Sequence, residues 1–196
     1  MVAYLFFASG VNNFARLPIL KENINNISNY SDNNFKDKIS VLFFLGKNIS
    51  DRQGDALNLN QKIYKRFYQF EDFQFVVICP LGSEESAENL KIKLGSGTNT
   101  DMVKWNFVFI KPEFILELFN SLETEDNLDF NYGSHFAYII DKKLSLRGRN
   151  DDNNMKFGYD TRSVADINNF MIDDVKIILA EYRLALKKNG ITRKDL

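Results

Sequence analysis

The sequence predicts an α/β fold: a three-layer α/β/α sandwich with a mostly parallel central sheet, an antiparallel C-terminal hairpin and a long C-terminal helix. Short apolar runs typical of buried strands alternate with stretches in which apolar residues recur every three or four positions. Strands joined through helices pair in parallel by right-handed crossovers. Two strand-like runs late in the chain lie too close together for a helix between them, so a hairpin is expected there.

The first strand and helix follow a lead-in, residues 16–38, that is expected to be irregular because it is largely polar and contains Pro18. The apolar run Ile39–Gly46 predicts a buried strand, and the polar segment Lys47–Gly54 predicts the loop after it. Spacings of three and four then predict one apolar face of a helix, formed by Ala56, Leu59, Ile63, Phe67 and Phe70.

The second and third strand–helix units repeat this pattern. Phe73–Cys79 predicts a strand that Pro80 ends, and the next helix buries Ala87, Leu90 and Leu94. Gly95–Asn99 is expected to be a flexible link because it is rich in glycine. Trp105–Ile110 predicts the third strand. Proline is tolerated in the first turn of a helix, so the following helix is expected to begin at Pro112 and to bury Phe114, Ile115, Leu118, Phe119 and Leu122.

The C-terminal third is expected to contain the hairpin and the last helix. His135–Asp141 and Leu144–Arg149 predict the two strands of the hairpin, and a polar insert spans residues 150–159. Charge placement along a helix dipole predicts that the last helix begins near Asp173 and Asp174. It is expected to end at Gly190, after Lys187 and Lys188, and to bury Ile172, Val175, Leu179, Tyr182 and Leu186.

The chain of 196 residues is expected to hold one domain, residues 39–190, with a polar tail at 191–196. Residues 1–15 carry no charge and Val2–Ala8 is strongly apolar. A membrane-spanning helix needs about 20 apolar residues, so this run is short. It is interpreted as the remnant of a membrane anchor that begins further upstream. The alternatives are a buried N-terminal strand or helix, and a complete signal sequence, although the basic start of a signal sequence is lacking.

Composition excludes several classes of function. A net charge of −1 provides no basic field for a nucleic-acid backbone, so no nucleic-acid partner is expected. The single cysteine cannot form an internal disulfide or a CxxC pair. With only one histidine as well, a zinc cage of Cys and His is excluded in practice, and neither a metal nor another cofactor is expected.

Several local strings stand in a telling order within residues 35–188, among them Phe43-Phe44, Trp105–Glu113 and Tyr159-Asp160-Thr161. Taken in order, these strings resemble the Sco/SenC branch of the thioredoxin-like superfamily. The aromatic pair Phe43-Phe44 resembles that family's strand before its active-site motif. Trp105–Glu113 resembles its later strand and helix. The remaining strings are Ile78-Cys79-Pro80, Ile139–Lys142, Leu146–Gly148 and Tyr159-Asp160-Thr161. The resemblance implies a thioredoxin-like fold.

The functional residues of that family do not carry over. The resemblance implies a CxxxC motif after the first strand, whose thiolates bind copper and exchange disulfides. This chain has no cysteine between Gly46 and Gly54. The family's histidine ligand would fall near Gly133, two residues before the only histidine of the chain. The candidate surface of the ancestral site therefore consists of Lys47, Asn48, Asp51, Arg52 and His135.

Three functions are compatible with this reading. The leading one is a non-catalytic, Sco-like protein of the bacterial cell envelope, tethered to the membrane and facing the periplasm, that binds an unknown protein partner or supports assembly. The second is a copper chaperone with atypical ligands drawn from Cys79, Met102, His135, Met155 and Met171. The third is a single-cysteine peroxidase or thiol oxidoreductase using Cys79, which is otherwise an inert, packed thiol.

Overall fold

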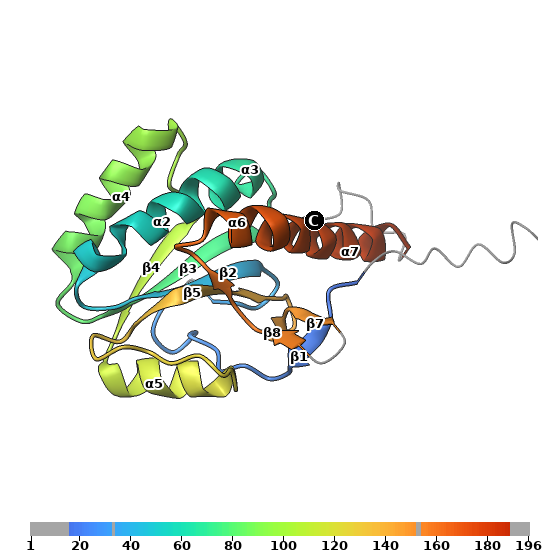
Figure 1. The fold of residues 1–196 in the computed structure, drawn as a ribbon, viewed down its shortest axis with the longest axis horizontal. Coiled ribbons are helices and arrows are strands. Elements are labelled where there is room, and N and C mark those ends of the chain that lie inside the picture. The colour runs from blue at the N-terminus through green and yellow to red at the C-terminus, as the bar shows by residue number, and fades with distance from the viewer. Residues whose placement is uncertain (1–15, 33, 152–153, 189–196) are drawn as a thin grey trace, which may run out of the picture.

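The computed structural model describes residues 16–32, 34–151 and 154–188, which form three layers (Figure 1). A sheet forms the middle layer. The helices α2 (Gln53–Leu59), α4 (Glu84–Thr98) and α7 (Ile172–Lys188) cover one face of it, and α5 (Pro112–Ser121) covers the other. The predicted α/β/α sandwich is confirmed.

The centre of the sheet is parallel, as predicted. The strands β2 (Ile39–Leu45), β3 (Phe73–Pro80) and β4 (Trp105–Ile110) pair in parallel. β2 and β3 are buried at every position, as expected for strands covered on both faces. The predicted hairpin consists of β5 (Gly133–Ile140), which pairs antiparallel with β2, and β6 (Leu146–Arg147), which pairs antiparallel with β5.

The antiparallel part of the sheet is larger than the expected hairpin. Within the lead-in, β1 (Ile19–Lys21) pairs with β6, so this segment is not wholly irregular. β9 (Tyr159–Asp160) pairs with β5, and the polar insert forms a small separate hairpin of β7 (Arg149–Asp151) and β8 (Asn154–Lys156). These short strands were missed because two or three residues are too few to show an alternating apolar pattern.

Alternate residues of the central strands enter two separate cores. Val41, Phe43 and Leu45 point to the face covered by α2, α4 and α7, whereas Leu42 and Phe44 point to the face covered by α5. The lead-in helps to cover the second face, where Ile24, Ile27 and Phe35 are buried. This part of the chain is therefore a structural component of the domain.

The first helix departs from the predicted stripe at its end. After α2 the chain continues through a π-helical segment, η2 (Asn60–Tyr64), into a short α3 (Lys65–Phe67). Four of the five predicted core residues are buried, but Phe70 lies beyond the end of the helix and is 39% exposed. The π-helical segment changes the periodicity, so the stripe cannot continue past Phe67.

The predicted flexible link Gly95–Asn99 is helical instead, because α4 runs through Thr98. The Asn60 side chain holds this last turn: its Nδ2 donates to the carbonyl oxygen of Leu94 (2.9 Å) and to Thr98 Oγ1 (3.0 Å). Asn99 then ends the helix with a left-handed backbone at φ +52°. A long-range contact thus overrides the low helix propensity of the glycines.

The last helix, α7, has Asp173 and Asp174 in its first turn, as predicted. A helical stretch that was not predicted precedes it: α6 (Val164–Asp166) leads through a second π-helical segment, η3 (Ile167–Met171), into α7. Ser163 caps this stretch, since its hydroxyl accepts a hydrogen bond from the Asp166 amide (3.1 Å). The stretch was missed because Asn168 and Asn169 interrupt the apolar pattern.

Residues 1–15, Gly190 and the tail 191–196 lie outside the described residues, so the alternatives for the N-terminal segment stay predictions. Along the stretch from residue 16 to 188 that the structure describes, no helix is both long enough and apolar enough to cross a membrane.

Candidate functional site

The candidate site lies where the chain leaves β2. Gly46 adopts φ +76°, and a Cβ on it would come within 2.9 Å of the Gly133 main chain. The next residue, Lys47, donates its amide to the Asn131 carbonyl oxygen at 2.8 Å. The loop after β2 therefore packs directly on the segment that leads into β5. It continues into η1 (Ile49–Arg52) and α2.

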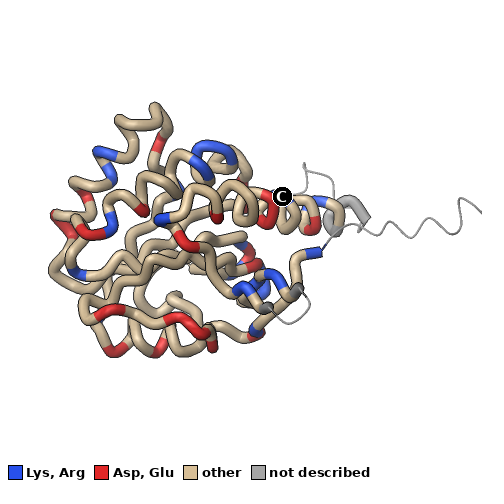
Figure 2. Tube along the Cα trace, viewed as in Figure 1, with Lys and Arg blue, Asp and Glu red and all other residues tan. Residues whose placement is uncertain are grey.

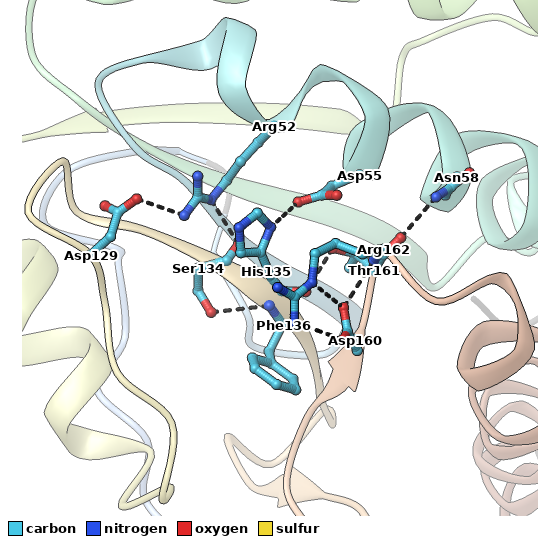
Figure 3. A network of polar contacts seen from close by, with 10 residues as sticks. All are labelled: Arg52, Asp55, Asn58, Asp129, Ser134, His135, Phe136, Asp160, Thr161 and Arg162. Atoms are coloured by element: carbon cyan, nitrogen blue, oxygen red, sulfur yellow. Dashed lines mark hydrogen bonds and ion pairs between the residues drawn. The ribbon is translucent and has the colours of Figure 1, made fainter.

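Arg52, predicted on the surface, is buried instead. Its guanidinium forms an ion pair with Asp129 (Nη2 to Oδ2, 2.7 Å), and its Nε donates to the carbonyl oxygen of Ser134 at 3.1 Å (Figure 3). Gly133 makes room for it, because a Cβ there would lie 2.7 Å from Arg52 Nε. Asp129 Oδ1 accepts from the amides of Asn131 and Gly133, so one carboxylate ties together the arginine and the turn.

His135 forms a second polar pair with Asp55. The His135 Nδ1 and Asp55 Oδ2 atoms are 2.6 Å apart, and their side chains are 35% and 8% exposed respectively (Figure 3). Thr161 donates both its amide and its hydroxyl to the His135 carbonyl oxygen, at 2.8 and 2.6 Å. The Asn58 amide group donates in turn to the Thr161 carbonyl oxygen. Side chains of α2, β5 and the turn after β9 thus meet at one place.

Arg162 and Asp160 form a third ion pair, which is more exposed to solvent than the other two. Two nitrogens of the Arg162 guanidinium donate to the two carboxylate oxygens of Asp160, at 2.9 and 2.8 Å. These hydrogen bonds hold the pKa of the Asp160 carboxyl below its usual range, and the nearby His135 adds to the effect. A pocket of about 500 Å³ opens between this pair and the Arg52–Asp129 pair, with His135 in its lining.

Four exposed residues close to this pocket, Lys47, Asn48, Asp51 and Phe130, are termed the rim; of these, Asp51 lines the pocket itself. Phe130 is 89% exposed and precedes Asn131, whose carbonyl oxygen accepts the hydrogen bond from the Lys47 amide. An aromatic side chain with that much surface in water is unusual for a residue with only a packing role.

Sequence reasoning missed Asp55, Asp129, Phe130 and Arg162. Asp55 stands four residues after Asp51, so helical spacing gave a weak signal for it. Asp129 and Phe130 lie in an acidic connection without any pattern, and Arg162 follows the Tyr159-Asp160-Thr161 string without belonging to it. Their roles depend on where β5 and β9 pair, which is a long-range property.

Cys79 lies inside the molecule, away from any surface. It is fully buried in the core under α2, α4 and α7. Burial raises the pKa of its thiol far above the ordinary value, and the negative charge of Glu84 adds to this. A protonated, inaccessible thiol is a poor nucleophile, so the packing role fits the geometry better than a peroxidase or oxidoreductase role.

The candidate copper ligands lie in different parts of the fold. Copper(I) selects thiolate and thioether sulfur. Met155 is half exposed on β8, Met171 is buried in η3, and the Nδ1 atom of His135 is engaged by Asp55. In the described ranges of the chain, no three His, Cys, Asp or Glu side chains come together in a group that could hold a metal ion.

No protein-family model and no curated protein matches this chain. Among solved structures, it is similar to a SCO1/SenC family lipoprotein from Bacillus anthracis, with a TM-score of 0.54 and 18% identity over 84% of this chain and 99% of that one. A disulfide isomerase-like protein from Bacteroides thetaiotaomicron gives a TM-score of 0.49 at 9% identity over 85% of this chain and 95% of that one.

A copper-bound ScoI from Arabidopsis thaliana gives a TM-score of 0.43 at 18% identity, covering 72% of this chain and 86% of that one. The similarity to the Bacillus anthracis protein shows that this chain has a thioredoxin-like fold. Its only cysteine is Cys79, so the chain holds no cysteine pair.

Proposed function

We propose that this chain is a Sco-like thioredoxin-fold protein of the bacterial cell envelope that binds a protein partner without thiol chemistry. The binding surface is the rim of the pocket at the end of β2, formed by Lys47, Asn48, Asp51 and Phe130. The same edge of an α/β sheet, beyond the carboxyl ends of its parallel strands, is the usual place for ligands.

The observation that carries this proposal is the exposure of Phe130. Exposed aromatic side chains dominate the energetics of protein interfaces, because they bury a large area at a low cost in conformational entropy. Phe130 is 89% exposed, and the carbonyl oxygen of the next residue, Asn131, binds the Lys47 amide. A partner that covers this ring removes its apolar surface from water.

The floor of the pocket supports the proposal because it is fixed before any partner arrives. Arg52 is tied to Asp129 and Ser134, and His135 is tied to Asp55. Ion pairs and hydrogen bonds occupy the position at which the fold usually carries reactive sulfur. A surface that is already ordered loses less entropy on binding, which favours a binding role.

The envelope location rests on two observations. Residues 1–15 are uncharged and largely apolar, which suits a membrane tether. The similar structure from Bacillus anthracis is that of a lipoprotein. Both support a chain held at a membrane with its thioredoxin-like domain in the periplasm.

Site-specific photo-crosslinking tests the binding surface. A photoreactive phenylalanine analogue replaces Phe130 in the full chain, and in a matched control it replaces Phe70, which is 39% exposed and follows α3. Both proteins are irradiated in an envelope extract. A single adduct is expected at position 130 and not at position 70, and excess wild-type chain is expected to compete it away while a Phe130→Ser chain does not.

Three results decide the proposal. The adduct is expected to persist in a Cys79→Ser background, because the thiol takes no part in binding. Equal adducts at positions 130 and 70, or none at position 130, contradict a partner site at the rim. Loss of the adduct with Cys79→Ser, together with normal folding of that variant, contradicts a role without thiol chemistry.

A further inference from the structure

The strand β4 forms one edge of the sheet, far from the pocket rim in the strand order. Its neighbour on one side is β3, and in the described part of the chain no strand pairs with its other side. Phe75 donates its amide to the Lys104 carbonyl oxygen. In a parallel ladder the main-chain groups of alternate residues face the same neighbour, so the even-numbered residues of β4 bond to β3. The main-chain groups of Phe107 and Phe109 therefore point outward, away from β3.

This edge lacks the usual protection against pairing. Natural proteins shield edge strands with charged residues, proline, bulges or covering segments. Trp105–Ile110 contains no charge, no proline and no glycine, and all its residues except Asn106 have high strand propensity. Free main-chain groups on such a strand provide a template for one more strand.

A groove of about 430 Å³ runs along the edge between β4 and α4. Trp105, Phe107 and Phe109 line it from the strand, because odd-numbered residues of β4 point to the face that carries α4. Phe107 and Phe109 are only partly buried there. The groove therefore offers aromatic surface directly beside the unpaired main-chain groups.

Charges on the other wall of the groove are separated along α4. Glu84, Glu85 and Glu88 occupy its N-terminal half, and Lys91 and Lys93 follow in the C-terminal half (Figure 2). Glu84, Glu88 and Lys91 line the groove itself. The first turns of α4 are acidic and the lysines lie near its middle, so a second copy of the helix in antiparallel orientation can place its lysines opposite the glutamates.

We propose that two copies of this chain associate through β4, with the strands antiparallel about a two-fold axis near Phe107. The two sheets then continue into each other, and the outward groups of Phe107 and Phe109 gain main-chain partners. Phe107 lies opposite Phe107 of the second copy, as a cross-strand aromatic pair. The two α4 helices lie on the same face, and Glu84 of each copy faces Lys91 of the other.

Charge reversal on α4 tests this interface in the full chain. Glu84→Lys alone and Lys91→Glu alone each place like charges opposite one another twice, so each is expected to raise the dimer dissociation constant about tenfold. Sedimentation velocity over a concentration series measures it. Both residues are at the surface, and Glu117→Lys on the exposed side of α5 is the matched control that is expected to leave the dimer unchanged.

Mixing the two variants gives the decisive result. In a pair of one Glu84→Lys chain and one Lys91→Glu chain, both contacts are attractive again, so a heterodimer is expected although each variant alone is weakened. Association through another segment of the chain would not follow this pattern. Two results overturn the proposal. One is a wild-type chain that stays monomeric, in which case the edge is left to an extended segment of a different protein. The other is a dimer that neither charge reversal weakens.

Discussion

At the scale of single residues, Arg52 and Arg162 differ in how deeply their side chains are buried. Its side chain is only 6% exposed, whereas that of Arg162 is 55% exposed, and each forms an ion pair with an aspartate. When a buried ion pair loses one member, the remaining group stays desolvated and without a partner. In an exposed ion pair, water takes the place of the lost member. The two arginines therefore make different contributions to the free energy of unfolding.

We expect Arg52→Met to lower the free energy of unfolding by about 2 kcal/mol, because Asp129 and the Ser134 carbonyl oxygen lose their donor. Arg162→Met is the matched control and is expected to change it by less than about 1 kcal/mol. Urea denaturation of both variants measures the difference. Equal losses would mean that Arg52 has no special structural role.

The site residues show how far single positions can be predicted. Lys47, Asn48 and Asp51 were predicted from the loop after the first strand, because the position of that loop follows from local patterns. The partners of Arg52 and His135 are 77 and 80 residues away in the sequence. Neither pairing leaves a local pattern, because both depend on the register between β2 and β5.

At the scale of elements, α4 shows how a tertiary contact extends a helix through glycines. Gly97 lies in its last turn, and a Cβ there would meet no atom within 4 Å. A Cβ on Gly95 would lie 3.1 Å from Met102 Cγ. We expect Gly97→Ala to raise the free energy of unfolding by about 0.5–1 kcal/mol, since alanine has the higher helix propensity.

Gly95→Ala is the matched comparison for this prediction. Its gain in helix propensity is the same, but the Met102 side chain must move, so a smaller gain or a loss is expected. Thermal unfolding of both variants distinguishes the two positions. A destabilising Gly97→Ala would show that the last turn of α4 is not helical in solution.

The elements that were predicted well are those with regular apolar patterns. The three parallel strands and α5 form where the apolar patterns predicted them. In α5, Ile115, Leu118 and Phe119 are buried as predicted, whereas Phe114 is only partly buried. The π-helical segments η2, which follows α2, and η3, which precedes α7, alter the period of the helical stretches that contain them. The first stretch was therefore predicted to extend too far, to Phe70, and the part of the second that precedes Asp173 was missed.

At the scale of the whole molecule, the fold and the site share residues. Two cores on opposite faces of the sheet hold the layers together: Ile49 of the loop after β2 belongs to one, and Leu128 and Phe136 from the pocket lining pack against the other. The scaffold thus fixes the position of the site, while the chemistry of the site depends on the side chains placed on it. The aromatic residues of those cores also determine how the protein responds to alkali.

Burial raises the pKa of Tyr64 to about 12 and that of three further tyrosines above the usual range, namely Tyr138, Tyr159 and Tyr182. In the unfolded chain these phenols ionise near pH 10, whereas the folded state keeps their protons. Their contribution to stability is therefore complete below pH 10 and is lost as the pH rises toward the folded values. The free energy of unfolding is expected to fall by about 1.4 kcal/mol per pH unit for each phenol that stays protonated.

Urea denaturation between pH 8 and pH 12 measures this slope. Tyr64→Phe removes one of the four phenols, so its free energy of unfolding is expected to fall less steeply with pH above pH 10, by the contribution of one proton. The variant also loses, at every pH, the hydrogen bond that the Lys104 amide donates to the Tyr64 hydroxyl. The wild-type chain, measured over the same pH range, provides the reference slope. An unchanged slope in Tyr64→Phe would mean that this phenol ionises equally well in the folded chain, and that the aromatic core under α2 is open to water.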